Sequence, residues 1–178
     1  LYEYRAPRTK PRNDGATLLP GLEEVTGAGR EHLFESLLMA GVHDIPILRG
    51  LAGDIGAVSS ATIWNAGRSI LSELEFDGGV RANLYIGTND FKWYDETVIA
   101  FGQTDRVTIT FPHPYSDGQA AIAERVSSED GGVVCVRAEP TYENAFRTEA
   151  RAFARYVSSG ETPLTGPVEG LKDVQTVT

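Results

Sequence analysis

The stretch AGVHDIPILRGLAGD, residues 40–54, decides the fold because it ends an apolar helix and leads into a run of strands. Pro46 cannot donate to the carbonyl of Val42, so we expect the helix to kink or restart within a residue or two of His43. Such a kink would suit a binding site. Apolar residues at three- and four-residue spacing predict one buried helix face: Leu33, Phe34, Leu37, Leu38, Val42, Ile45, Leu48 and Leu51.

The bulk composition favours a soluble globular protein that folds as a single domain over residues 1–178, with 1–29 as an extended leading segment. A net charge of -9 and scattered basic residues argue against a nucleic-acid partner. The sequence has no run of about eighteen apolar residues and no signal-peptide pattern, so we expect no membrane span and a cytoplasmic location. The lone cysteine, Cys135, lies in the apolar run VVCVRA and is expected to be buried.

Alternating apolar and polar residues predict six or more strands after the first helix. In residues 68–76 the apolar Ile70, Leu74 and Phe76 alternate with Glu73 and Glu75. The sequence Asp77-Gly78-Gly79 predicts a tight turn, so the strands on either side of it should pair antiparallel. The expected strand segments are residues 57–64, 68–76, 80–86, 91–102, 106–111, 120–126 and 133–138, with residues 127–132 as a loop.

Two helices are expected at the end of the chain. Thr141 is a candidate cap for a helix over residues 142–158, which Gly160 should end. Pro167 suits the first turn of a last helix that runs to the final residue, because its missing donor costs nothing there.

Three segments carry a resemblance to one family. They are GVHDIPILRGLAGDIGAV (41–58), WYDETVIAFGQTDRVTITFPHPY (93–115) and YENAFRTEARAFARYVSSGETPLTGPVEGLKDVQ (142–175). In this order they resemble the C-terminal domain of the Gfo/Idh/MocA oxidoreductases, which are NAD(P)-dependent sugar and inositol dehydrogenases.

The resemblance implies an α/β (α+β) fold: an open, mainly antiparallel sheet of about six or more strands, with helices on one face. The other face would make homodimer or homotetramer contacts. It further implies a substrate-binding domain that acts on a sugar, inositol or related polyol or keto compound. NAD or NADP would be bound mainly by an N-terminal Rossmann domain absent from this chain, so the chain alone is expected to be inactive. Gly27-Ala28-Gly29 is no substitute, because no buried parallel strand precedes it.

His43 matches the family's catalytic histidine, and an imidazole titrates near working pH, as a general acid or base must. The family's aspartate four residues earlier is replaced here by Met39. Three outcomes stay open. Asp44 has taken over orienting the imidazole, or the proton relay is altered, or the protein does no redox chemistry.

Other candidates for substrate contact lie at strand ends and loops. His113 and Tyr115 belong to the loop FPHPY, and Trp64 and Asn65 end a strand, with core packing as the alternative for Trp64. Arg49 would bind a substrate carboxylate or phosphate, or else form an ion pair.

Two further features concern metals and partners. His32 lies eleven residues before His43, about 16 Å along a helix, so the two cannot share a metal ion. Trp93 and Tyr94 are candidates for a subunit interface together with Tyr85, since aromatic residues concentrate at such surfaces.

Two alternatives to the dehydrogenase remain. A non-catalytic sugar-sensing regulator or scaffold would explain Met39, and NAD-assisted glycoside hydrolysis also occurs in the family.

Overall fold

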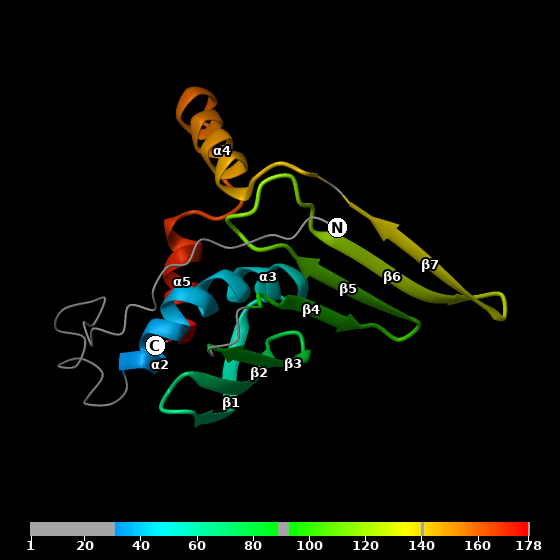
Figure 1. The fold of residues 1–178 in the computed structure, drawn as a ribbon, viewed down its shortest axis with the longest axis horizontal. Helices are drawn as coiled ribbons and strands as arrows, with labels where there is room; N and C mark the ends of the chain where they lie inside the picture. The colour runs from blue at the N-terminus through cyan, green and yellow to red at the C-terminus, as the bar shows by residue number, and fades with distance from the viewer. Residues whose placement is uncertain (1–30, 89–92, 140, 178) are drawn as a thin grey trace. The chain divides into compact units, whose positions relative to one another are not determined.

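The computed structural model describes residues 31–88, 93–139 and 141–177. Its contacts divide the chain into two compact units (Figure 1): a first unit, Leu1–Asn89 with Pro167–Thr178, and a second unit, Asp90–Gly166. The described residues contain helices and two antiparallel sheets of three and four strands, which confirms the α+β class.

The described part of the first unit begins with a helical segment that changes its winding twice. An α-helix, α2 (Glu31–Ser36), passes into a π-helical turn, η1 (Leu37–Gly41), and then into α3 (Val42–Ala52). The Val42 N–H donates to the carbonyl of Leu37, five residues back, as in a π-turn. The predicted restart therefore lies directly before His43, while Pro46 lies inside α3. Gly53 ends α3 with a φ of 90°.

The wide turn brings the helix close to the elements below it. Gly41 is buried, and a Cβ there would lie 3.1 Å from Ile86 Cδ1 and 3.5 Å from Val177 Cγ1. A Cβ at residue 41 would therefore need the Ile86 side chain to shift slightly, so η1 packs closely on β3 at this point.

The first sheet follows, in the order β1-β2-β3: β1 (Ile55–Trp64), β2 (Ser69–Phe76) and β3 (Arg81–Gly87). As predicted, Ile70, Leu74 and Phe76 are buried, while the glutamates between them are partly exposed. The turn between β2 and β3 contains Gly79 with a φ of 79°, and the two strands pair antiparallel.

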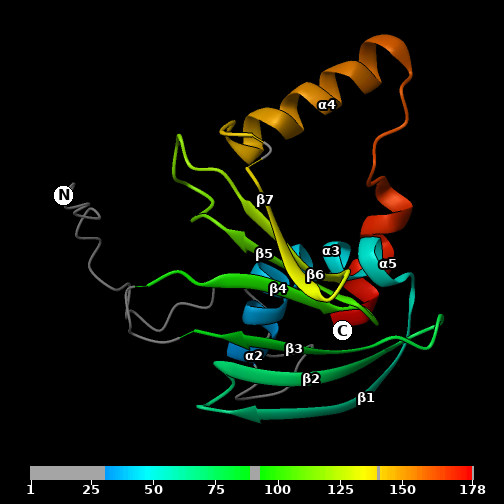
Figure 2. The same ribbon diagram turned by 90° about the vertical axis from the view of Figure 1, so that its right-hand side faces the viewer.

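The core of the first unit joins helices from both ends of the chain. Ile45 of α3, Leu74 and Phe76 of β2, and Val177 form one buried cluster. Val177 belongs to α5 (Pro167–Val177), which contacts α3 and η1, and Figures 1 and 2 both place α5 beside α3. Partly buried residues surround the cluster: Leu37, Leu38, Val42, Leu48, Ala52, Ile55, Ala82 and Leu84.

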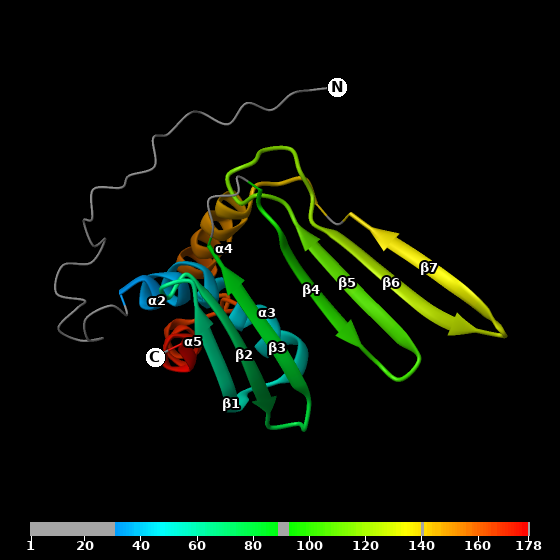
Figure 3. The same ribbon diagram turned by 60° about the horizontal axis from the view of Figure 1, so that its bottom comes forward.

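The second unit contains a four-stranded antiparallel meander (Figure 3). Its strands are β4 (Glu96–Phe101), β5 (Asp105–Phe111), β6 (Ile122–Glu129) and β7 (Gly132–Ala138). The loop predicted over residues 127–132 is shorter than expected, because residues 127–129 belong to β6 and Gly132 begins β7. Asp130 and Gly131, with φ of 48° and 80°, make a two-residue turn that keeps β6 and β7 paired to their ends.

Cys135 is exposed, contrary to the prediction that it is buried. It lies on β7, the last strand in the order of its sheet, and every residue of this strand is exposed. An apolar run alone therefore did not show whether the strand has a covered face.

The helix of the second unit, α4 (Ala145–Ser159), begins later than predicted. Asn144 is the cap, and its side chain accepts a hydrogen bond of 3.0 Å from the Phe146 N–H. Thr141 Oγ1 instead accepts from the Glu143 N–H at 3.0 Å, in a turn that precedes the helix. Gly160 ends α4 as predicted, with a φ of 72°.

The alternation of β2 gives a stability test with a control on the same strand. Leu74 is 2% exposed and Leu71, on the opposite face, is 42% exposed. We expect Leu74→Ala to lower the free energy of unfolding by about 3 kcal/mol, because it leaves a cavity in the core. Leu71→Ala should cost less than about 1 kcal/mol. Urea unfolding measures both, and equal losses would contradict the assigned strand faces.

Candidate functional site

His43 and Asp44 lie in the first turn of α3, directly after η1. The imidazole is exposed and Asp44 is partly buried. Burial raises the pKa of the Asp44 carboxyl, and the positive charge of His43 opposes this rise. The two side chains therefore interact through their charges, and an exposed imidazole with a carboxylate beside it can exchange a proton with a bound hydroxyl group.

Met39, at the position where the resembling family has an aspartate, belongs to η1 and is 66% exposed. Its thioether cannot exchange a proton. Asp44 is adjacent to His43 in the sequence, and the two side chains interact through their charges.

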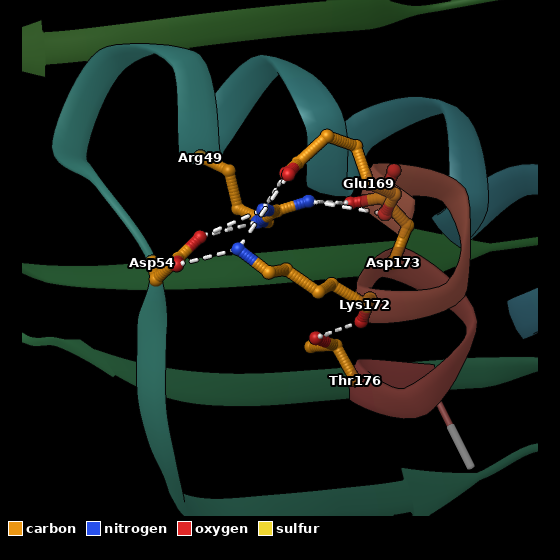
Figure 4. A network of polar contacts seen from close by, with 6 residues as sticks. All are labelled: Arg49, Asp54, Glu169, Lys172, Asp173 and Thr176. Atoms are coloured by element: carbon orange, nitrogen blue, oxygen red, sulfur yellow. Dashed lines mark hydrogen bonds and ion pairs between the residues drawn. The ribbon is translucent and has the colours of Figure 1, made fainter. Parts of the chain in front are cut away.

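Arg49, near the end of α3, lies in a network of carboxylates (Figure 4). Its Nη2 and Nε donate to Asp54 Oδ1 at 2.7 and 3.1 Å, its Nη1 donates to Asp173 Oδ1 at 2.6 Å, and its Nη2 also donates to Glu169. The Arg49 side chain is 9% exposed and that of Asp173 is 7% exposed. This geometry favours the ion-pair alternative for Arg49.

Lys172 completes the network from α5. Its Nζ donates to Asp54 Oδ2 at 3.0 Å and lies 3.6 Å from Glu169 Oε1. Hydrogen bonds from Arg49, and then from Lys172, hold the pKa of Asp54 below its usual value. The Arg49 hydrogen bond likewise lowers the pKa of Glu169. The network therefore joins α3, the start of β1 and α5 by charge.

A cavity of about 470 Å³ adjoins this network within the first unit. Residues 55–58 of β1 form one wall, and the polar lining comes from Arg49, Asp54, Asp77, Lys172, Gln175 and Thr176. Sequence reasoning missed this cavity, because its walls lie more than a hundred residues apart along the chain. Since the cations that line it already bind carboxylates, it is poorly suited to an anionic ligand.

The second unit carries a row of aromatic side chains that contact one another. Tyr94 meets His113 edge-on at 5.1 Å between ring centroids, His113 lies 5.7 Å from Tyr115, and Tyr115 stacks on Phe146 of α4 at 5.6 Å. Tyr115 is 77% exposed. The structure thus brings together the predicted His113 and Tyr115, and adds Phe146 of α4.

Trp64 and Asn65 lie in the first unit, at the turn between β1 and β2. Trp64 is 44% exposed and stacks on Tyr85 of β3 at 5.8 Å, so it does not pack in the core. Asn65 and Ala66 both have a φ of 54°. The turn touches α2, since a Cβ on Gly67 would lie 3.1 Å from the Leu33 backbone nitrogen.

Several expectations concern metals, cofactors and membranes. Among the described residues, no three His, Cys, Asp or Glu side chains form a group that could hold a metal ion, and no helix is long and apolar enough to cross a membrane. Residues 27–29 and the side chain of His32 lie outside what the structure describes.

Comparison with known proteins gives a likeness of fold. No family model and no curated protein matches the chain. An NADPH-dependent oxidoreductase from Desulfitobacterium hafniense DCB-2 is similar with a TM-score of 0.67 and 18% identity, over 81% of this chain and 44% of that protein. KijD10, a 3-ketoreductase from Actinomadura kijaniata in complex with NADP and TDP-benzene, is similar with a TM-score of 0.58 and 19% identity. The likeness covers 80% of this chain and 44% of KijD10.

The oxidoreductase yvaA from Bacillus subtilis gives a TM-score of 0.57 with 16% identity, over 80% of this chain and 47% of yvaA. The chain therefore spans less than half the length of each of these three proteins, and what it shares with them is the fold.

The Arg49 network gives a second stability test. We expect Arg49→Met to lower the free energy of unfolding by about 3 kcal/mol, because it leaves the buried Asp173 carboxylate without its cation. Adding Asp173→Asn should restore part of the loss. As a control, Arg81→Met removes an exposed pair with Glu75 at 2.8 Å and should cost less than about 1 kcal/mol. A loss no larger than that of the control would refute the structural role of Arg49.

The lowered pKa values predict acid sensitivity. Asp54 and Glu169 stabilise the fold above their ordinary pKa values of 3.8 and 4.5, and this stabilisation is lost as the pH falls through their lower folded values. The raised pKa of Asp44 has the opposite effect, because it favours the folded state at low pH. The unfolding temperature, measured from about pH 6 to about pH 3, should therefore fall less steeply in Arg49→Met than in the wild type. Parallel curves would count against the network.

Proposed function

We propose that this chain is the substrate-binding and oligomerisation domain of an NAD(P)-dependent oxidoreductase of the Gfo/Idh/MocA type. The substrate would be a sugar, inositol or related polyol, or its keto form. The observation that supports this most is the shared fold: the chain aligns over about 80% of its length with three oxidoreductases, one of them a 3-ketoreductase in complex with NADP.

In this proposal His43 carries the proton step. Oxidation of a secondary alcohol requires the hydroxyl proton to leave as the carbon loses hydride, and the exposed imidazole is suited to accept it. Asp44 would stabilise the resulting imidazolium through its charge, since the two groups already interact. In the reverse direction His43 would return the proton to the carbonyl oxygen.

Substrate contacts are proposed at the predicted aromatic positions. His113 and Tyr115 are exposed in the second unit, and Trp64, beside Asn65, is exposed in the first. Aromatic faces pack well against the C–H surfaces of sugar rings. Arg49 is left out of this set, because its donors bind Asp54, Asp173 and Glu169.

The described residues do not fit a dinucleotide. Every strand pair among them is antiparallel, whereas a Rossmann cradle needs a parallel strand, a glycine-rich turn and a helix. We therefore propose that NAD or NADP is held by an N-terminal domain outside this chain, and that the chain alone is inactive. The oxidoreductases of similar fold are more than twice as long as the part matched.

The proposed partner is a second copy of the chain. A homodimer or homotetramer would form through the sheet face, and the cytoplasm is the proposed location. Large exposed side chains on β4, such as Ile99 and Phe101, are the kind of surface that such a contact would cover.

A non-catalytic sugar sensor of the same fold is the second candidate, and the exposed Met39 favours it. Under this alternative a polyol binds equally well to the wild type and to His43→Ala, and neither oxidises it. Met39→Asp would then be expected to leave the protein inactive.

The leading proposal is tested by His43→Ala in the protein made from the complete reading frame. We expect kcat for polyol oxidation to fall by about 10²- to 10⁴-fold while KM changes little, because the general base is lost. Met39→Leu, on the same helical segment, is the control and should keep the activity. Formation of NADH or NADPH at an unchanged rate in His43→Ala would remove His43 from the mechanism.

A further inference from the structure

Among the described residues, β7 pairs with a strand on one side only and so forms an edge of the four-stranded sheet. The strand order ends at β7, as Figure 3 shows, and all seven of its residues are exposed, with Val133 at 74% and Val136 at 56%. Proteins usually protect such an edge with proline, a bulge or several charges. Here the pairing with β6 runs without a shift, the strand has no proline, and Arg137 is its one charged residue.

The turn geometry shows which backbone groups of β7 face outward. Asp130 and Gly131 form a two-residue hairpin, so the flanking pair, Glu129 and Gly132, is a hydrogen-bonded pair. Hydrogen-bonded and non-hydrogen-bonded pairs alternate along an antiparallel ladder. The N–H and C=O groups of Val133, Cys135 and Arg137 therefore point away from β6, toward the open edge.

These outward groups are self-complementary. Two copies of β7 laid antiparallel overlap over all seven residues only when Cys135 faces Cys135. In this register the outward residues face one another, with Val133 opposite Arg137, and no like charges meet within the strand. A shift of one residue would set outward groups against inward ones, and a shift of two would shorten the overlap.

We propose that the β7 edge binds the same edge of a second copy of this chain, about a two-fold axis beside Cys135. Two four-stranded sheets would then form one continuous sheet. This contact differs from the sheet-face contact proposed above and does not depend on the proposed oxidoreductase activity.

The register makes opposite predictions for two substitutions at one exposed position. Val133→Lys places a lysine opposite the partner's Arg137 at both ends of the interface, and should raise the dimer dissociation constant by about tenfold. Val133→Glu is the matched control: it places a glutamate opposite the same arginine, and should leave the dissociation constant equal or lower. Sedimentation velocity over a range of concentrations, on the 178-residue chain, measures both.

The lone cysteine reports on the register itself. Residues opposite each other in a hydrogen-bonded pair lie about 5.5 Å apart at Cα, within reach of a short bismaleimide. We expect a cross-linked dimer through Cys135 in the wild type and in Val133→Glu, and a weaker one in Val133→Lys. A wild type that stays monomeric would overturn the proposal. So would a dimer that both substitutions leave unchanged and that Cys135 does not cross-link, since it would use another surface.

Discussion

The charge network around Arg49 is the constraint on which the first unit depends. It holds the end of α3, the start of β1 and one face of α5, although α5 lies about 120 residues later in the chain. Asp173 is buried, and a buried carboxylate without a cation would be costly. The position of Arg49 thus fixes where α5 docks, and with it Val177, which completes the apolar core.

The same docking bears on His43. Gly41 closes the π-turn directly before α3 and is buried, and this turn packs against α5 and β3. His43 follows two residues later, on the outside of this fixed turn. Its orientation is therefore determined by tertiary packing as much as by Pro46, which the sequence pointed to first.

Features governed by local chemistry could be predicted from the sequence. The alternation of β2, the Gly79 turn and the Gly160 helix end all follow from a few adjacent residues. Where two nearby residues could both cap a helix, the prediction chose the wrong one: Asn144, and not Thr141, caps α4.

Features that depend on contacts between distant residues could not be predicted from the sequence pattern. The carboxylates around Arg49, the exposure of Cys135 and the stacking of Phe146 on Tyr115 require knowledge of which segments meet. For the same reason the cavity beside Lys172 left no signature in the sequence, whereas the histidine and tyrosine of the FPHPY loop were adjacent enough to be grouped. The hairpin turn between β1 and β2 and the one between β6 and β7 differ in a way that matters for engineering. The turn at Gly67 rests on Leu33, whereas a Cβ built on Gly131 meets no described atom within 4 Å. A fluorophore or an epitope could therefore be inserted at the turn between β6 and β7 with little disturbance. An insertion at the Gly67 turn would instead displace α2.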